Sequence, residues 1–97
     1  MTSNPLDDLQ RWYAKQCNGA WEHGHGVEIG TLDNPGWTVT VDLSGTALEH
    51  RDFQDLELHR TENDWVSCRI RDDRFDGRGG PENLTEVLRI FVEWSAG

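Results

Sequence analysis

The chain has 97 residues, 35% of them hydrophobic and 28% charged, so it is long enough for one folded domain, 1–97, and too short for two. Eighteen acidic and nine basic residues leave a net charge of −9, which repels nucleic acid and anionic membranes and attracts basic partners. No apolar run approaches the ~20 residues of a membrane span, and the N-terminus lacks a secretion signal, so we expect a cytoplasmic protein.

The N-terminal stretch 4–18 is predicted to be a helix. Asn4 is a favourable N-cap, Pro5 suits the first helical turn, and Gly19 supplies the stop. Apolar residues recur at helical spacing along it as far as Cys17. The spacing therefore predicts one apolar helix face that packs on the rest of the domain, with Cys17 in the core.

After this helix the apolar period changes from near 3.6 to 2. The stretches 27–30 and 37–43 both alternate apolar with polar or small residues, which predicts two half-buried antiparallel strands. Between them, Asn34-Pro35-Gly36-Trp37 favours a type II turn in which Gly36 takes the positive φ. Because two-residue hairpins prefer the mirror-image turns, we expect a longer loop that includes Asp33.

The second half of the chain predicts two more strands and a helix. A strand is expected over 52–60, with a bulge near Gln54-Asp55 where the alternation breaks, and another over 65–71. The charged stretch 72–80 reads as a loop, and a helix with a wide apolar stripe begins at Pro81. This order, α-β-β-β-β-α, predicts the α+β class: a four-stranded antiparallel β-meander with N-terminal and C-terminal helices packed on one face.

The sheet face that the helices leave open should carry every second strand residue. A tryptophan among carboxylates, as predicted there for Trp65, is typical of an interface hot spot. The alternative is that Trp65 packs over its sheet neighbours while the rest is solvated. The expected members are Glu28, Thr38, Thr40, Asp42, Asp55, Glu57, His59, Trp65, Ser67, Arg69 and Arg71.

Glu22, His23 and His25 are the best candidates for a metal or catalytic site. Two histidines at i and i+2 of an extended segment point the same way, and with a carboxylate, such as Glu22 or Asp33, they would suit zinc. No further ligand completes the set, and the glycines between them make a flexible mount. A small metal-binding protein or enzyme centred on Glu22, His23 and His25 is therefore the alternative function.

Other catalytic and metal-binding patterns match poorly. The run 72–77 departs from a calcium loop, because Arg74 holds the third position and Asn83 the twelfth. Cys68 sits inside an apolar alternation, where burial raises the pKa of a thiol and makes it inert. Neither a phosphate-binding glycine loop nor a serine elbow is present. We therefore expect a protein that is not an enzyme and that uses no metal or cofactor.

Aromatic and turn motifs are spread over almost the whole chain. The run Thr31-Leu32-Asp33-Asn34-Pro35-Gly36-Trp37 is the most specific of them. The others are Trp12-Tyr13, Cys17, Trp21-Glu22-His23, Asp42-Leu43, Gly45-Thr46, Asp64-Trp65, Phe75-Asp76-Gly77 and Phe91-Val92-Glu93-Trp94. Together they resemble the immunity protein 53 family, whose members are predicted to be small cytosolic bacterial proteins encoded beside a polymorphic toxin that they block.

The resemblance implies a non-catalytic protein that binds and neutralises a cognate toxin domain. It brings no established toxin-binding residues. The net charge agrees with it, because an acidic inhibitor suits a basic toxin, such as a nuclease. Block of the toxin's active site and an allosteric clamp are both compatible with the sequence, as is any oligomeric state. We expect partner contacts at Trp65, Asp42, Glu57, Asp72, Asp73 and Asp76.

Overall fold

The structure is a computed structural model and describes residues 4–97. Within these residues the strands form one sheet, and no helix is long and apolar enough to cross a membrane. In chain order the elements are α1 (Pro5–Gln16), α2 (Trp21–Gly24), β1 (Val27–Leu32), β2 (Gly36–Asp42), β3 (Leu56–Thr61), β4 (Asp64–Arg71), β5 (Arg74–Gly79) and α3 (Leu84–Ala96).

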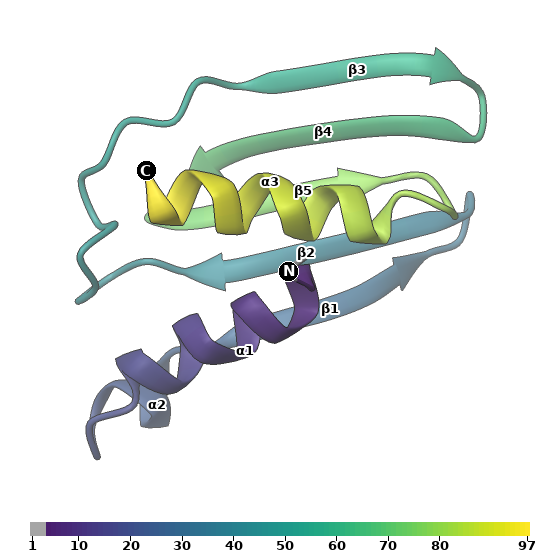
Figure 1. Cartoon of the computed structure of the whole chain (residues 1–97). Helices are drawn as coiled ribbons and strands as arrows, with labels where there is room; N and C mark the ends of the chain where they lie inside the picture. Colours follow the sequence, from purple (N-terminus) through teal and green to yellow (C-terminus); the bar gives the residue numbers. More distant parts are fainter. Residues whose placement is uncertain (1–3) are drawn as a thin grey trace.

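The sheet is antiparallel throughout, and α1 and α3 lie over one of its faces (Figure 1). This confirms the predicted α+β class with the terminal helices on one side. The predicted four-stranded meander is wrong. The sheet has five strands in the order β1-β2-β5-β4-β3, so β2 pairs with β5 and not with the next strand in sequence. Residues 43–55 carry the chain from β2 to β3 at the far edge.

The missed strand, β5, lies in the stretch 72–80 that was expected to be a loop. Asp72 and Asp73 both have positive φ, 53° and 59°, as a two-residue type I′ hairpin turn requires. The turn returns the chain as β5, which pairs with both β2 and β4 at the centre of the sheet. The sequence concealed the turn because Asp-Asp is a weaker signal for it than Asn-Gly or Asp-Gly.

The glycines of β5 are the reason that the sequence did not predict a strand there. Toward the helices β5 presents Phe75, Gly77 and Gly79, so its inward face has only one apolar side chain. A Cβ on Gly77 would lie 2.6 Å from Cγ1 of Val87, and one on Gly79 would lie 3.1 Å from Cγ2 of the same residue. The glycines thus let α3 approach the centre of the sheet, and the apolar alternation expected of a buried strand is absent.

The first hairpin also differs from its prediction. Leu32 and Gly36 are register partners, so the loop consists of residues 33–35 and includes Asp33 as expected. The predicted type II turn is wrong, because Gly36 begins β2 and is not among the positive-φ glycines of the described chain. Glycine is required there for space, since a Cβ would collide with the carbonyl oxygen of Gly79 on the neighbouring strand.

Helix α1 begins as predicted and ends sooner. The side chain of Asn4 accepts a hydrogen bond from the backbone N–H of Leu6 at 2.9 Å, and Pro5 is the first helical residue. The last helical residue is Gln16, and the backbone of Cys17 is already extended. Cys17 therefore leaves the apolar stripe and is exposed, so its predicted place in the core is wrong.

The core fills the space between the helices and the sheet face beneath them, which we call the covered face. Phe91 of α3 stands at its centre, with the rings of Trp12 and Phe75 each packed against it at a centroid distance of 5.2 Å. Both pairs have the T-shaped arrangement that aromatic rings favour. The buried cluster comprises Leu9, Val39, Val41, Leu43, Leu48, Val66, Cys68, Phe75, Val87, Leu88 and Phe91.

The connection 43–55 is tied to the C-terminal end of α3. The indole N–H of Trp94 donates to the carbonyl of Asp52 at 2.8 Å, and the Arg51 guanidinium donates to the carbonyl of Trp94 at 2.9 Å. The strand predicted from residue 52 therefore starts only at Leu56. The bulge expected near Gln54-Asp55 is wrong too, since the register shift lies between residues 59 and 61.

Candidate functional site

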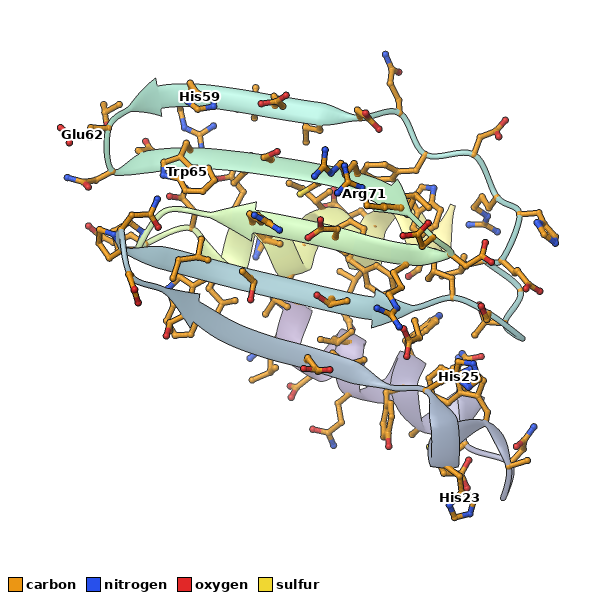
Figure 2. The ribbon with its side chains drawn as sticks, turned by 180° about the vertical axis from the view of Figure 1, so that it is seen from behind. His23, His25, His59, Glu62, Trp65 and Arg71 are labelled. Carbon is orange, nitrogen blue, oxygen red and sulfur yellow. The ribbon has the colours of Figure 1, made fainter. Side chains whose placement is uncertain are left out.

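The sheet face opposite the helices is turned toward the viewer in Figure 2. Strand pairing aligns its side chains in rows across the sheet; Thr40, Asp76 and Arg69, for example, are neighbours on β2, β5 and β4. We call this surface the open face. Its members are Glu28, Thr38, Thr40, Asp42, Glu57, His59, Trp65, Ser67, Arg69, Arg71, Arg74, Asp76 and Arg78.

All the residues predicted for this face lie on it except Asp55, which precedes β3. The prediction missed Arg74 and Arg78, because they belong to the unrecognised β5, and it placed Asp76 in a loop. One signal was available: from 74 to 78 a charged residue occupies every second position, which is the period of a strand with one solvated face.

The open face is not the carboxylate surface that was expected. Four of the nine basic residues of the chain are on it, facing four carboxylates. Arg74 pairs with Asp42 at 2.9 Å. Asp76 stands between Arg69 and Arg78, at 3.7 Å and 3.5 Å. Charges of both signs therefore alternate across β2, β5 and β4, and most of the acidity of the chain lies elsewhere.

Trp65 lies at the end of the open face next to the β3–β4 turn. Its ring stacks on His59, the register partner on β3, with centroids 6.1 Å apart and planes 14° from parallel. The pair borders a hollow of about 360 Å³, whose charged lining residues are Glu57, Arg69, Asp76 and Arg78. An aromatic ring beside arginines in a hollow is typical of the energetic centre of a protein interface.

A buried asparagine holds the backbone of Trp65. Asn83, 6% exposed, accepts a hydrogen bond from the Trp65 N–H at 3.3 Å and donates to the carboxylates of Asp64 and Glu86 at 2.9 Å and 3.0 Å. The Asn83 amide, followed by the Arg60 guanidinium, holds the pKa of Asp64 below its usual range. The main chain at Trp65 is thus anchored to the start of α3, which keeps the indole in a defined place.

The other predicted contact residues divide between the face and its rim. Asp42, Glu57 and Asp76 project from the open face with Trp65. Asp72 and Asp73 form the β4–β5 turn, and Asp72 borders a second hollow, of about 200 Å³, together with Arg71, Arg74 and Arg78. Four of the six predicted residues thus lie on the open face and two in the turn at its edge, and four arginines lie among them.

Glu22, His23 and His25 are not arranged as the alternative function, a metal site, would require. Residues 21–24 form the helical turn α2 and not an extended segment, so the two histidine rings point apart (Figure 2). His25 stacks on Trp21 with centroids 5.6 Å apart, and the Glu22 carboxylate accepts hydrogen bonds from the backbone N–H groups of Asn18 and Gly19.

These side chains are therefore engaged in local structure. A cleft of about 330 Å³ beside them is lined by Glu22, His23, His25 and Asp42, but within residues 4–97 no three His, Cys, Asp or Glu side chains converge as metal ligands. Hydrogen bonds from its own backbone N–H and from the N–H groups of Asn18 and Gly19 hold the pKa of Glu22 below its usual range. A carboxylate so occupied holds the chain that leads into α2 and is a poor proton acceptor.

The buried thiol offers no nucleophile. Cys68 is 1% exposed on the covered face, and burial raises its pKa to about 12. A thiol with that pKa is almost entirely protonated at neutral pH, and the protonated form does not attack electrophiles. The inert structural role predicted for Cys68 agrees with this environment.

A comparison with known protein families matches nearly the whole chain. Residues 6–96 match the model of a protein family described as Immunity protein 53. The chain belongs to this family. No curated protein and no solved structure matches it.

Membership of the immunity protein 53 family indicates a toxin-neutralising role and implies a cognate toxin as the partner. Immunity proteins are generally non-catalytic. For an immunity 53 protein with this fold, the open face is the best candidate contact surface. It is built on strands held by the core beneath, and it combines a stacked tryptophan with arginines in a hollow.

Proposed function

We propose that this immunity 53 protein is a non-catalytic inhibitor that binds its cognate polymorphic toxin through the open face. The observation that carries the proposal is the hollow beside Trp65, because tryptophan and arginine are the residue types most enriched in interface hot spots. Trp65, Asp42, Glu57 and Asp76 contact the toxin from the face, and Asp72 and Asp73 extend the contact at its rim.

The size of the open face supports this proposal. A stable interface needs about 800 Å² from each partner. The molecule measures 42 × 34 × 24 Å, and the sheet spans its broad side, so one face offers an area of that order. The strands beneath are held by the core, so the toxin meets a surface whose shape is set before binding, which lowers the entropic cost of association.

The net charge acts at longer range. Four of the eighteen acidic residues lie on the open face, so most of the negative field arises from the rest of the surface. A net charge of −9 attracts a basic toxin, such as a nuclease, and makes association fast and sensitive to salt. The proposal places the encounter in the cytoplasm, where the two free thiols stay reduced.

Co-expression with the product of the adjacent gene tests the proposal. We expect that the neighbouring toxin arrests growth when expressed alone and that the wild-type protein restores growth. Trp65→Ala should lose this protection and weaken binding by about 30-fold or more, which is the loss at a hot spot of about 2 kcal/mol. Tyr13→Ala is the matched control, because Tyr13 is an aromatic residue exposed on α1, away from the open face.

The inhibitor function and the choice of the open face are contradicted by different outcomes. A neighbouring product that is harmless, or that stays toxic beside the wild-type protein, contradicts the inhibitor function. Full protection by Trp65→Ala, together with loss of protection by Tyr13→Ala, places the contact on the helical side and contradicts the choice of face.

A further inference from the structure

An unusual share of the positive charge of this acidic chain is gathered in one place. Arg69 and Arg71 on β4 and Arg74 and Arg78 on β5 all project from the open face of two adjacent strands. We call these four residues the arginine row. The remaining five basic residues are distributed over the other elements of the chain.

The arginine row contains an unfavourable pair. Arg71 and Arg74 are register partners that flank the β4–β5 turn, so two positive charges lie directly opposite each other. Like charges in this position destabilise a hairpin. Arg74 is compensated by Asp42 at 2.9 Å, whereas within residues 4–97 no carboxylate lies at ion-pair distance from Arg71. Within the described chain Arg71 therefore faces a like charge across the hairpin and has no direct ion-pair partner to offset it.

The other two arginines share one carboxylate. Asp76 is 3.7 Å from Arg69 and 3.5 Å from Arg78, and both contacts are longer than a charge-assisted hydrogen bond. Each guanidinium carries five N–H donors in a planar fork, so a single aspartate leaves most of them free. Arg71, Arg74 and Arg78 also border the hollow of about 200 Å³, together with Asp72 and Asp76, and this hollow gives an incoming side chain a place to enter.

We propose that the arginine row binds a cluster of carboxylate side chains on the toxin. This inference rests on the proposed function and adds the chemistry of the partner surface. The planar fork of arginine matches a carboxylate in a bidentate manner, and a carboxylate beside Arg71 would offset the Arg71–Arg74 repulsion. The general negative field thus draws in a basic protein, and the arginine row selects an acidic cluster within its surface.

Nucleic acid is the competing anionic occupant. Its backbone carries a dense row of phosphates, and its affinity for proteins depends on the release of counterions by positive surface. A chain with a net charge of −9 opposes that approach from every side, whereas a protein that is basic overall and acidic locally meets no such barrier. The charges of the whole molecule therefore favour a protein carboxylate as the occupant.

The test is a binding titration of the purified protein against an inactivated form of the toxin encoded by the adjacent gene. Arg71→Glu should weaken binding by about 30-fold or more, because it replaces an attraction with a repulsion. Arg89→Glu is the matched control, an exposed arginine on α3 that should stay within about twofold of wild type. Since Arg71→Glu also removes the repulsion with Arg74, its melting temperature should not fall, which separates lost binding from lost folding.

Several outcomes would overturn the inference. If Arg71→Glu binds like wild type while Trp65→Ala does not, the arginine row has no role and the proposed function still stands. Equal losses of affinity for Arg71→Glu and Arg89→Glu would indicate only an effect of the net charge, and this result would also reject the inference. Binding of a fluorescent single-stranded oligonucleotide that depends on Arg71 would identify a phosphate site instead. Failure of the wild-type protein to bind the toxin would reject the proposed function itself.

Discussion

The two faces of strand β5 lie in opposite environments, since one packs against α3 and the other faces solvent. Toward α3 the strand presents Phe75 and two glycines, and the fit to the helix excludes water. Toward solvent it presents Arg74, Asp76 and Arg78, whose charges stay hydrated and paired. The covered face therefore determines whether the chain folds, and the open face can change its side chains at little cost in stability. A protein that must match one particular partner benefits from this separation.

The largest expected effect is on the covered face. Phe75→Ala should lower the free energy of unfolding by about 3–5 kcal/mol, because it leaves a cavity beside Phe91 in a fully buried cluster. The adjacent Asp76→Ala, on the open face, should cost less, about 1 kcal/mol, because its contacts with the exposed Arg69 and Arg78 side chains are long, at 3.7 Å and 3.5 Å. Urea unfolding of both variants measures the contrast, and equal losses would contradict the division between the faces.

Gly77→Ala tests the close approach of α3. The new methyl group would lie 2.6 Å from Cγ1 of Val87, so we expect a loss of about 1–3 kcal/mol from overpacking. Val87→Ala in the same molecule removes this contact and leaves the one with the Phe75 ring at 2.8 Å, so the double variant should lose less than the sum of the two single losses. Gly24→Ala is the control, since a Cβ there meets no atom within 4 Å. Simple additivity in the unfolding cycle would refute the contact.

Asn83 joins the two faces, because it lies at the start of α3 and holds the backbone of Trp65. Asn83→Ala should lower the free energy of unfolding by about 1–3 kcal/mol, since it leaves the part-buried Trp65 N–H without this partner. Asn63→Ala, at an exposed turn position, should stay within about 0.5 kcal/mol of wild type. Thermal and urea unfolding would both report the difference, and similar values for the two variants would exclude an anchoring role.

The smallest effect has the opposite sign. Arg71→Thr should raise the free energy of unfolding by about 0.2–1 kcal/mol, because it removes the like-charge pair with Arg74. Arg69→Thr makes the same chemical change at a position paired with Asp76 and should bring no gain. Both variants can be compared by urea unfolding at low salt, where surface charges act most strongly. A stabilised Arg69→Thr would show that threonine propensity, and not charge, is responsible.

Much of the open face could be predicted from alternation alone. The period-2 patterns of β2 and β4 placed Trp65, Asp42 and Arg69 on it correctly, because one solvated side is a local property of a strand. The candidate site at Glu22, His23 and His25 could not be judged in the same way. Whether two histidines point together depends on the backbone between them, and α2 makes that backbone helical.

The sequence by itself determined the elements whose side chains carry a period: both long helices, the first hairpin, β4, and a sheet with one polar face. Only the tertiary structure decided that 74–79 is the central strand and that β2 pairs with it. The physical reason is that glycine is needed at positions 77 and 79 because Val87, on another element, packs close against them. The insertion of β5 also brought Arg74 beside Asp42 and Asp76 beside Arg69, and so gave the open face its mixed charge.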